Sequence, residues 1–171
     1  MTPLPDISGH ASLVAWRLDQ AVHAAAWDSG EGAFRVGGRW NVKGSKYVVY
    51  CSVDPATAIL EVAVHKGFHT LDTVAHVLTS LRIDPAAGPR IHVVNPSDLP
   101  NANWLTPGVP SIGQQQFGDA LLDKHEFVLL PSVVSKHSWN LIFDSKRCGK
   151  MVAKVFQEAF ALDTRLHPPA T

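Results

Sequence analysis

The chain has 171 residues, of which 46% are hydrophobic and 18% charged, a balance typical of a folded globular protein rather than a disordered one. Its 15 basic and 15 acidic residues cancel at pH 7, which argues against a nucleic-acid binder, since such proteins usually carry a basic excess. The length suits a single domain over residues 1–171, and no stretch approaches the ~18 consecutive apolar residues of a membrane span.

The first predicted elements surround a glycine-rich segment. Leu13–Leu18 reads as a short strand, and the alanine-rich stretch Asp19–Trp27 predicts a helix. Val36–Gly44, VGGRWNVKG, is too rich in glycine for a helix and predicts a structured loop. Lys46–Ser52 carries apolar residues on both faces, which indicates an inner strand.

The middle of the chain begins with a clear helix signal. Asp54-Pro55 combines an N-cap residue with proline at the first helical position, and the predicted helix ends at Gly67. Residues 73–83 and 90–94 predict strands separated by DPAAGP. Residues 95–113 are rich in proline, asparagine and glycine and predict a long loop.

The last third alternates between element types. Residues 114–125 predict a helix, and residues 126–134 and 138–143 predict a pair of strands. Residues 151–162 fit a helix or a strand equally well, and the tail 163–171 reads as irregular. Because strands and helices do not alternate regularly, we expect an α+β domain with mixed β-sheets and flanking helices.

Glu61 stands out within the predicted helix, since it is the only charged residue between Pro55 and Val64. Thr57, Glu61 and His65 follow each other at intervals of four and form one polar stripe. The stripe fits a solvated helix face, or a carboxylate that faces a cleft and needs a partner or a chemical role.

Two arginines and a tyrosine are further candidates. Arg39 lies among glycines, which suits a guanidinium that binds phosphate, although a structural turn fits as well. Arg17 sits in an apolar strand and either reaches solvent or meets an anion. Tyr50 is either a core residue or an aromatic wall for a planar ligand.

Other catalytic classes find little support. Ser132 follows proline without the GxSxG elbow of a hydrolase nucleophile. His65 and His69 lie near Glu61 without a metal-binding motif, so no metal is expected. Cys51 and Cys148 allow one disulfide but do not indicate a secreted scaffold, and nothing marks Cys51 as activated. The first residues do not resemble a signal peptide, so we expect a cytoplasmic protein.

Taken together, the motifs WRL, GGRWNVKG, YVVYCS, PATAILEVAVH, FGDALL, LLPSVV, WNLIF and DTRL occur in the order seen in the RES-domain family. The resemblance covers a core of about residues 13–166. In its central block Arg39, Tyr50 and Glu61 are 11 and 11 residues apart. The chain departs from the family at Phe143-Asp144-Ser145, where an Asn-Pro pair often follows.

The resemblance assigns roles residue by residue. It places the family's catalytic residues on Arg39, Tyr50 and Glu61, and its binding residues on Arg17, Arg39, Tyr50, Ser132 and Asn140. It implies a fold like that of diphtheria-toxin-type ADP-ribosyltransferases. It also implies NAD⁺ as substrate and an Xre-type helix-turn-helix antitoxin as partner. The implied assembly is a hetero-oligomer with the antitoxin or a homo-oligomer of this chain.

The implied activity is cleavage of the nicotinamide–ribosyl bond of NAD⁺, with growth arrest through NAD⁺ depletion by hydrolysis or phosphorolysis. One alternative keeps the fold and transfers ADP-ribose to a specific host enzyme. Another is a catalytically silent binding module in which the glycine loop recognises a partner. Release of nicotinamide, and transfer of label from NAD⁺ to protein, would separate the three.

Overall fold

A seven-stranded mixed sheet, in the order β4-β5-β6-β2-β1-β3-β7, organises the computed structural model, which describes residues 12–163 and 165. Neighbouring strands are antiparallel except for the parallel pair β4 and β5. The strands are β1 (Val14–Gln20), β2 (Val48–Ser52), β3 (His76–Ile83), β4 (Ile91–Val93), β5 (Phe127–Pro131), β6 (Trp139–Asp144) and β7 (Val152–Phe160).

Helices and short 3₁₀ turns connect the strands. The α-helices are α1 (Glu31–Val36), α2 (Pro55–Lys66), α3 (Phe68–Thr73), α4 (Ile112–Lys124) and α5 (Ser145–Cys148). The 3₁₀ helices are η1 (Ala21–Ala26), η2 (Pro85–Arg90), η3 (Pro96–Asp98), η4 (Ala102–Leu105) and η5 (Gly149–Met151). This content confirms the expected α+β class, with a single mixed sheet.

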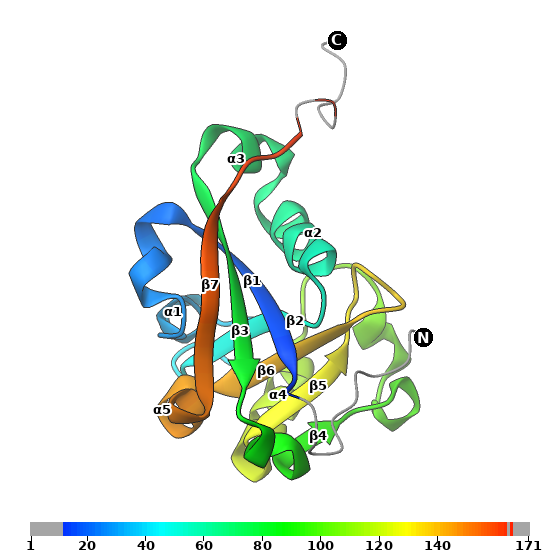
Figure 1. Cartoon of the computed structure of the whole chain (residues 1–171). Helices are drawn as coiled ribbons and strands as arrows, with labels where there is room; N and C mark the ends of the chain where they lie inside the picture. Colours follow the sequence, from blue (N-terminus) through cyan, green and yellow to red (C-terminus); the bar gives the residue numbers. More distant parts are fainter. Residues whose placement is uncertain (1–11, 164, 166–171) are drawn as a thin grey trace.

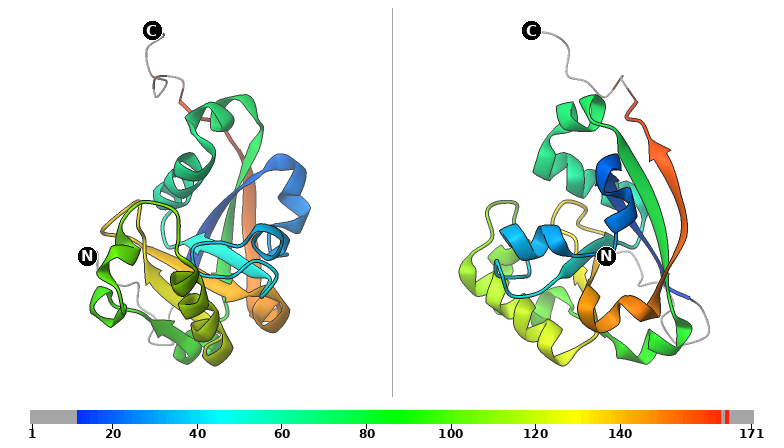
Figure 2. Two further views of the ribbon diagram at one scale, coloured as in Figure 1. Left: turned by 180° about the vertical axis from the view of Figure 1, so that it is seen from behind. Right: turned by 90° about the vertical axis from the view of Figure 1, so that its left-hand side faces the viewer.

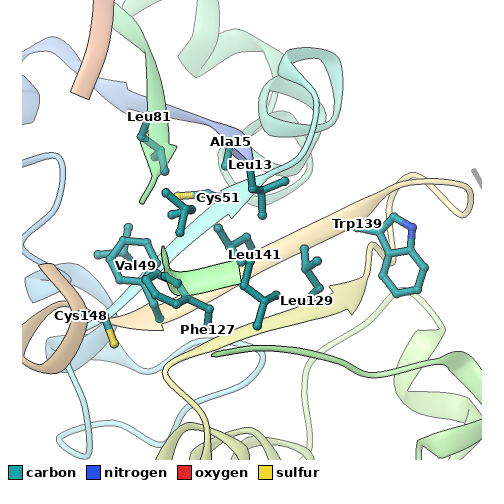
Figure 3. Packing of buried hydrophobic residues seen from close by; sticks show 14 of the residues in the cluster. Leu13, Ala15, Val49, Cys51, Leu81, Phe127, Leu129, Trp139, Leu141 and Cys148 are labelled. Atoms are coloured by element: carbon teal, nitrogen blue, oxygen red, sulfur yellow. The ribbon is translucent and has the colours of Figure 1, made fainter. Parts of the chain in front are cut away.

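The sheet is strongly twisted, so that β1, β3 and β7 run steeply across the direction of β2, β5 and β6 (Figure 1). The largest core cluster lies between these two halves, where Ala15 and Leu81 meet Val49, Leu129 and Leu141 (Figure 3). All five side chains are almost completely shielded from solvent. The buried apolar surface therefore holds the two halves of the sheet together.

Helices cover the outer faces of both halves (Figure 2). In one half, Ala63 of α2 and Leu71 of α3 pack against Leu18 and Leu78 of the sheet. In the other half, Leu122 of α4 packs in the same cluster as Ile142 of β6. The candidate site takes its side chains from the glycine loop (Val36–Gly44), from β1, β2, α2 and β6, and from the turn between β5 and β6 (residues 132–138).

The predicted helix after Asp54 is confirmed as α2. Asp54 caps it by accepting a hydrogen bond from the Thr57 backbone N–H at 2.7 Å, and Pro55 occupies the first turn. Gly67, with φ of 81°, ends it, as expected of a residue that tolerates positive φ. The cap fixes the register of α2 and hence the direction in which Glu61 points.

Several predicted boundaries are wrong. The first strand continues to Gln20, and the predicted helix Asp19–Trp27 is only the 3₁₀ helix η1. The short helices α1 and α3 were not predicted. Because α3 occupies Phe68–Thr73, the next strand begins at His76 rather than at Thr73.

The elements predicted for the last third of the chain agree better with the structure. The long loop before α4 is present, with two 3₁₀ turns, and α4 begins two residues before the predicted start. The strand pair is confirmed as β5 and β6, and the ambiguous segment near the C-terminus is the edge strand β7. Most of the tail 163–171 lies outside the described residues. No helix in the described part of the chain has the length and apolarity needed to cross a bilayer.

Candidate active site

The glycine loop is held in a fixed conformation against α4 (Figure 2, right). Asp119 accepts hydrogen bonds from the Val42 backbone N–H at 3.1 Å and the Ser45 hydroxyl at 2.9 Å. Gln115 donates to the Gly38 carbonyl at 2.8 Å. At Gly118 a Cβ atom would collide with the backbone of the loop, so glycine allows the close approach. The loop is therefore part of the folded framework rather than a free linker.

Tyr50, on β2, anchors the loop from the other side. Its hydroxyl donates to Asn41 Oδ1 at 2.8 Å and accepts from the Trp40 backbone N–H at 3.0 Å. A Cβ at Gly38 would lie 2.5 Å from this hydroxyl, which explains the second glycine of the loop. Burial raises the pKa of Tyr50 well above its ordinary value, so the phenol is neutral at physiological pH.

Arg39 extends from this loop towards the segment before α4. Its guanidinium donates to the Gly108 carbonyl at 2.9 Å and lies 3.5 Å from the Trp104 carbonyl. Burial lowers the pKa of Arg39, while Glu61 and Tyr50 raise it, and the net shift is downward. The charges of Glu61 and Tyr50 thus each act on Arg39.

Arg17 is hydrogen-bonded to the Tyr50 backbone and is already paired with a carboxylate. Its guanidinium donates to both carboxylate oxygens of Asp19, at 2.6 to 2.9 Å, and to the Tyr50 carbonyl at 3.0 Å. Burial by itself lowers the pKa of Arg17, but Asp19 outweighs this and the net shift is upward. The charge of Arg17 is therefore neutralised by Asp19, and its hydrogen bond to the Tyr50 carbonyl supports β2.

The carboxylate of Glu61 is held by two neutral donors. Ser132 Oγ donates to Oε1 at 3.0 Å, and Asn140 Nδ2 donates to the same oxygen at 2.5 Å. The other oxygen, Oε2, has His65 Nε2 at 3.9 Å, beyond hydrogen-bond distance. With 22% of its side chain exposed, Glu61 is not on a solvated helix face but directed into a polar cluster.

Ser132 and Asn140, the two donors to Glu61, are each held in place by a further hydrogen bond. Ser132 Oγ accepts from the Ser135 backbone N–H at 3.0 Å, which fixes it in the β5–β6 turn. Asn140 Oδ1 accepts from Ser52 Oγ at 2.7 Å, across the paired strands β2 and β6. The Ser52 bond fixes the orientation of the Asn140 amide, so that its NH₂ group faces Glu61.

The structure thus brings Glu61, Ser132 and Asn140 into direct contact. Tyr50 is hydrogen-bonded to the loop that carries Arg39, and Arg17 is hydrogen-bonded to the Tyr50 carbonyl. Sequence reasoning missed Ser52, Asn41 and Asp19. One signal was available for the first of these, since Ser52 shares a strand face with Tyr50. The partner of Asn41 could not be read from the sequence because it depends on how the loop folds onto β2.

The described residues offer no metal site, no disulfide and no activated cysteine. Among residues 12–163 and 165, no three His, Cys, Asp or Glu side chains are grouped to hold a metal. Cys51 and Cys148 are buried free thiols rather than a disulfide. Burial raises the pKa of Cys51 to about 12, which leaves it unreactive.

Comparison with known proteins agrees with this arrangement. The sequence model of the family described as RES domain matches residues 14–163. A relative named Toxin Res, from Pseudomonas putida strain KT2440, is 30% identical over 164 residues, covering 90% of this chain and 99% of the relative. Another Toxin Res, from Photorhabdus laumondii strain TT01, is 28% identical over 158 residues, covering 90% and 97%.

The fold also has a solved counterpart. The crystal structure of the M. tuberculosis MbcT–MbcA toxin–antitoxin complex contains a chain that matches with a TM-score of 0.62 and 20% identity, over 88% of this chain and 85% of that one. At this identity the match establishes the fold alone. The family match over most of the described residues, together with the full-length relatives, shows that this chain belongs to the RES domain family.

Proposed function

We propose that this protein is a RES-domain toxin that binds NAD⁺ and cleaves its nicotinamide–ribosyl bond. The observation that carries the proposal is the Glu61 carboxylate, oriented through Oε1 by Ser132 and Asn140 while Oε2 has no hydrogen bond among the described residues. A fixed carboxylate with a free oxygen is what a reaction through a ribosyl cation requires.

The chemistry follows from the charges. The bond between nicotinamide nitrogen and the anomeric carbon breaks, its electron pair leaves with nicotinamide, and positive charge develops on the ribose. Glu61 stabilises that charge and accepts a hydrogen bond from a ribose hydroxyl. Because nicotinamide departs neutral, no general acid is needed. Water then bonds to the anomeric carbon through oxygen and loses a proton, whereas phosphate bonds through an anionic oxygen and needs no proton loss.

Arg39 takes the pyrophosphate in this proposal, since a guanidinium binds phosphate oxygens in pairs. Two of its five N–H groups face backbone carbonyls, which leaves three for a ligand. Tyr50 is held by its hydroxyl, so its ring has a fixed orientation in which to stack on nicotinamide. Arg17 supports Tyr50 from behind and keeps two N–H groups for the ribose or phosphates.

The test is release of nicotinamide from NAD⁺ by the purified protein, measured with and without inorganic phosphate. Glu61→Gln keeps the shape of the side chain and removes its charge, so it should lower the rate by at least about 100-fold. Glu158→Gln, at an exposed position on β7, is the matched control and should retain full activity. If wild-type protein releases no nicotinamide under either condition, the proposal is wrong.

The acceptor is identified in the same assay with NAD⁺ labelled in the adenylate. Label recovered as ADP-ribose indicates hydrolysis, and label recovered as its 1″-phosphate indicates phosphorolysis. Label on a host protein would instead indicate an ADP-ribosyltransferase.

We also propose an antitoxin partner of the Xre-type helix-turn-helix class. Support comes from the matched chain of the solved structure, which is part of a toxin–antitoxin complex. Expression of the chain alone should arrest growth, and co-expression of a neighbouring helix-turn-helix gene product should restore it. Arrest that persists with every such product would contradict this part of the proposal.

A further inference from the structure

A pocket of about 360 Å³ adjoins the candidate site, formed by residues 101–114 and Arg39. Its volume is at the lower end of the range for small-molecule sites. The lining segment contains the η4 turn and the start of α4, and it belongs to the long loop that follows β4. Long ordered loops on a rigid framework commonly carry binding residues.

The pocket has a distinct chemical character. Arg39 is the one charged residue among the described residues that line it, so the pocket has cationic character and no carboxylate. The amides of Asn101 and Asn103, the Ser111 hydroxyl and the partly exposed Trp104 ring complete the polar and aromatic surface. The ligand that fits best combines an anionic group with a planar, hydrogen-bonding heterocycle.

We infer that this pocket binds the adenylate half of the dinucleotide, an inference that rests on the proposed function and assigns it a second subsite. Arg39 connects the two places, because it lines the pocket while the next residue, Trp40, is hydrogen-bonded to Tyr50 on β2. Strand β2 pairs with β6, whose Asn140 donates to Glu61. A pyrophosphate at Arg39 therefore has the ribosyl bond on the Glu61 side and the adenosine on the side of Trp104.

Hydrogen bonds within the pocket make its shape definite before any ligand arrives. Asn101 Oδ1 accepts from the Asn103 backbone N–H at 2.9 Å, and Gln114 Nε2 donates to the Trp104 carbonyl at 3.1 Å. Trp104 also packs on Phe117, with ring centroids 5.4 Å apart. The Asn103 side chain, in contrast, makes no hydrogen bond within the described residues, which leaves its amide free for a ligand.

The subsite predicts a substrate preference. Binding energy from the adenylate, which takes no part in bond cleavage, helps to hold the nicotinamide ribose at Glu61. Nicotinamide mononucleotide lacks that half of the molecule. Its kcat/KM should therefore be at least about 10-fold lower than that of NAD⁺.

The first experiment uses adenosine monophosphate as the probe and does not depend on catalysis. Titration into ¹⁵N-labelled protein should shift the backbone amides of residues 101–114 and leave those of the β5–β6 turn unchanged. The same compound should inhibit NAD⁺ cleavage competitively. Shifts confined to another region, or no binding at millimolar concentration, would overturn the inference.

The second experiment introduces a charge at the rim. Val109 lines the pocket and is 97% exposed, so Val109→Glu should not disturb folding. It should raise both the KM for NAD⁺ and the dissociation constant of adenosine monophosphate about five-fold, the size of one like-charge repulsion at a partly exposed site. Val22→Glu makes the same change at an 81% exposed valine outside the pocket and should alter neither.

The outcomes separate the two proposals. If wild-type protein releases nicotinamide and Val109→Glu has an unchanged KM, the subsite is refuted while the proposed function stands. If adenosine monophosphate binds at residues 101–114 but no nicotinamide is released, the adenylate site stands and the proposed function fails.

Discussion

Replacing Ser52 by alanine tests whether the orientation of the Asn140 amide matters for the site. Ser52 is 2% exposed and donates its hydroxyl to Asn140 Oδ1 at 2.7 Å, so alanine removes this donor without changing the surface. The amide is then free to turn. In the turned position Oδ1 faces the Glu61 carboxylate, where two acceptor oxygens repel each other.

The magnitude has two parts. Loss of the hydrogen bond and partial desolvation of the unpaired Asn140 oxygen should lower the free energy of unfolding by about 1–2 kcal/mol. For a chain of this size that corresponds to a decrease in Tm of about 2–8 °C. Because the Asn140 amide is no longer fixed as a donor to Glu61, the rate of NAD⁺ cleavage should fall about 10-fold while KM changes little.

Thermal unfolding and nicotinamide release measure the two parts separately. Ser80→Ala is the matched control, since Ser80 is also 2% exposed but its hydroxyl has no hydrogen-bond partner in the described residues. It should leave both quantities close to wild type. A double-mutant cycle between Ser52→Ala and Asn140→Ala should give a coupling energy of about 1 kcal/mol. Zero coupling would refute the reasoning, as would a Ser52→Ala protein with wild-type Tm and rate.

Three further results are expected. Gly38→Ala should lower Tm by several degrees and impair cleavage, because its Cβ would meet the Tyr50 hydroxyl at 2.5 Å, whereas Gly32→Ala, with open space around it, should be neutral or slightly stabilising in the same melting experiment. Burial, helped by the nearby His92, lowers the pKa of His125; the unfolded state therefore binds the proton more readily, and stability should fall as pH drops through the ordinary histidine range. His125→Gln should show a smaller loss of Tm between pH 7.5 and 5.5 than wild type, and an equal loss would contradict this origin. Both buried thiols should react with a thiol reagent only after denaturation; rapid labelling of the native protein would show that they are accessible.

The sequence predicted the helix of Glu61 because its signals are local. An N-cap aspartate, a proline in the first turn and a terminal glycine all lie within the helix or directly beside it. The inner strand that carries Tyr50 was recognised for a similar reason, since apolar residues fill both of its faces. In both elements the informative residues lie within the element or directly beside it.

The errors have physical causes as well. The helices α1 and α3 contain six residues each, too few for a clear period, and α1 includes Gly32. The alanine-rich stretch after β1 has high helix propensity, yet pairing with β3 extends the strand through Gln20. At the end of β1, the tertiary contacts with β3 therefore outweigh the local preference for a helix.

The partners of the site residues were the least predictable feature. Ser52 and Asn140 are 88 positions apart, and Ser132 and Glu61 are 71 apart, so their contact depends on the strand order of the whole sheet. The residue types could be selected from the sequence, but not the hydrogen bonds between them. The role of Arg17 illustrates the difference, because only the structure shows that Asp19 already neutralises its charge.

That difference between the two arginines bears on how a dinucleotide would be oriented. NAD⁺ carries its negative charge on the pyrophosphate and its positive charge on the nicotinamide ring. Arg17 contributes little net field, since its carboxylate partner is 2.6 Å away, whereas the hydrogen bonds of Arg39 within the described residues go to carbonyls. Among the proposed site residues, Arg39 and Glu61 are thus the two charges without a hydrogen-bonded partner of opposite charge in the described residues, and they differ in sign. In the proposed function only one direction of binding brings the pyrophosphate to Arg39 and the cationic ring to Glu61, so the charge pattern itself selects the orientation in which the ribosyl bond meets the carboxylate.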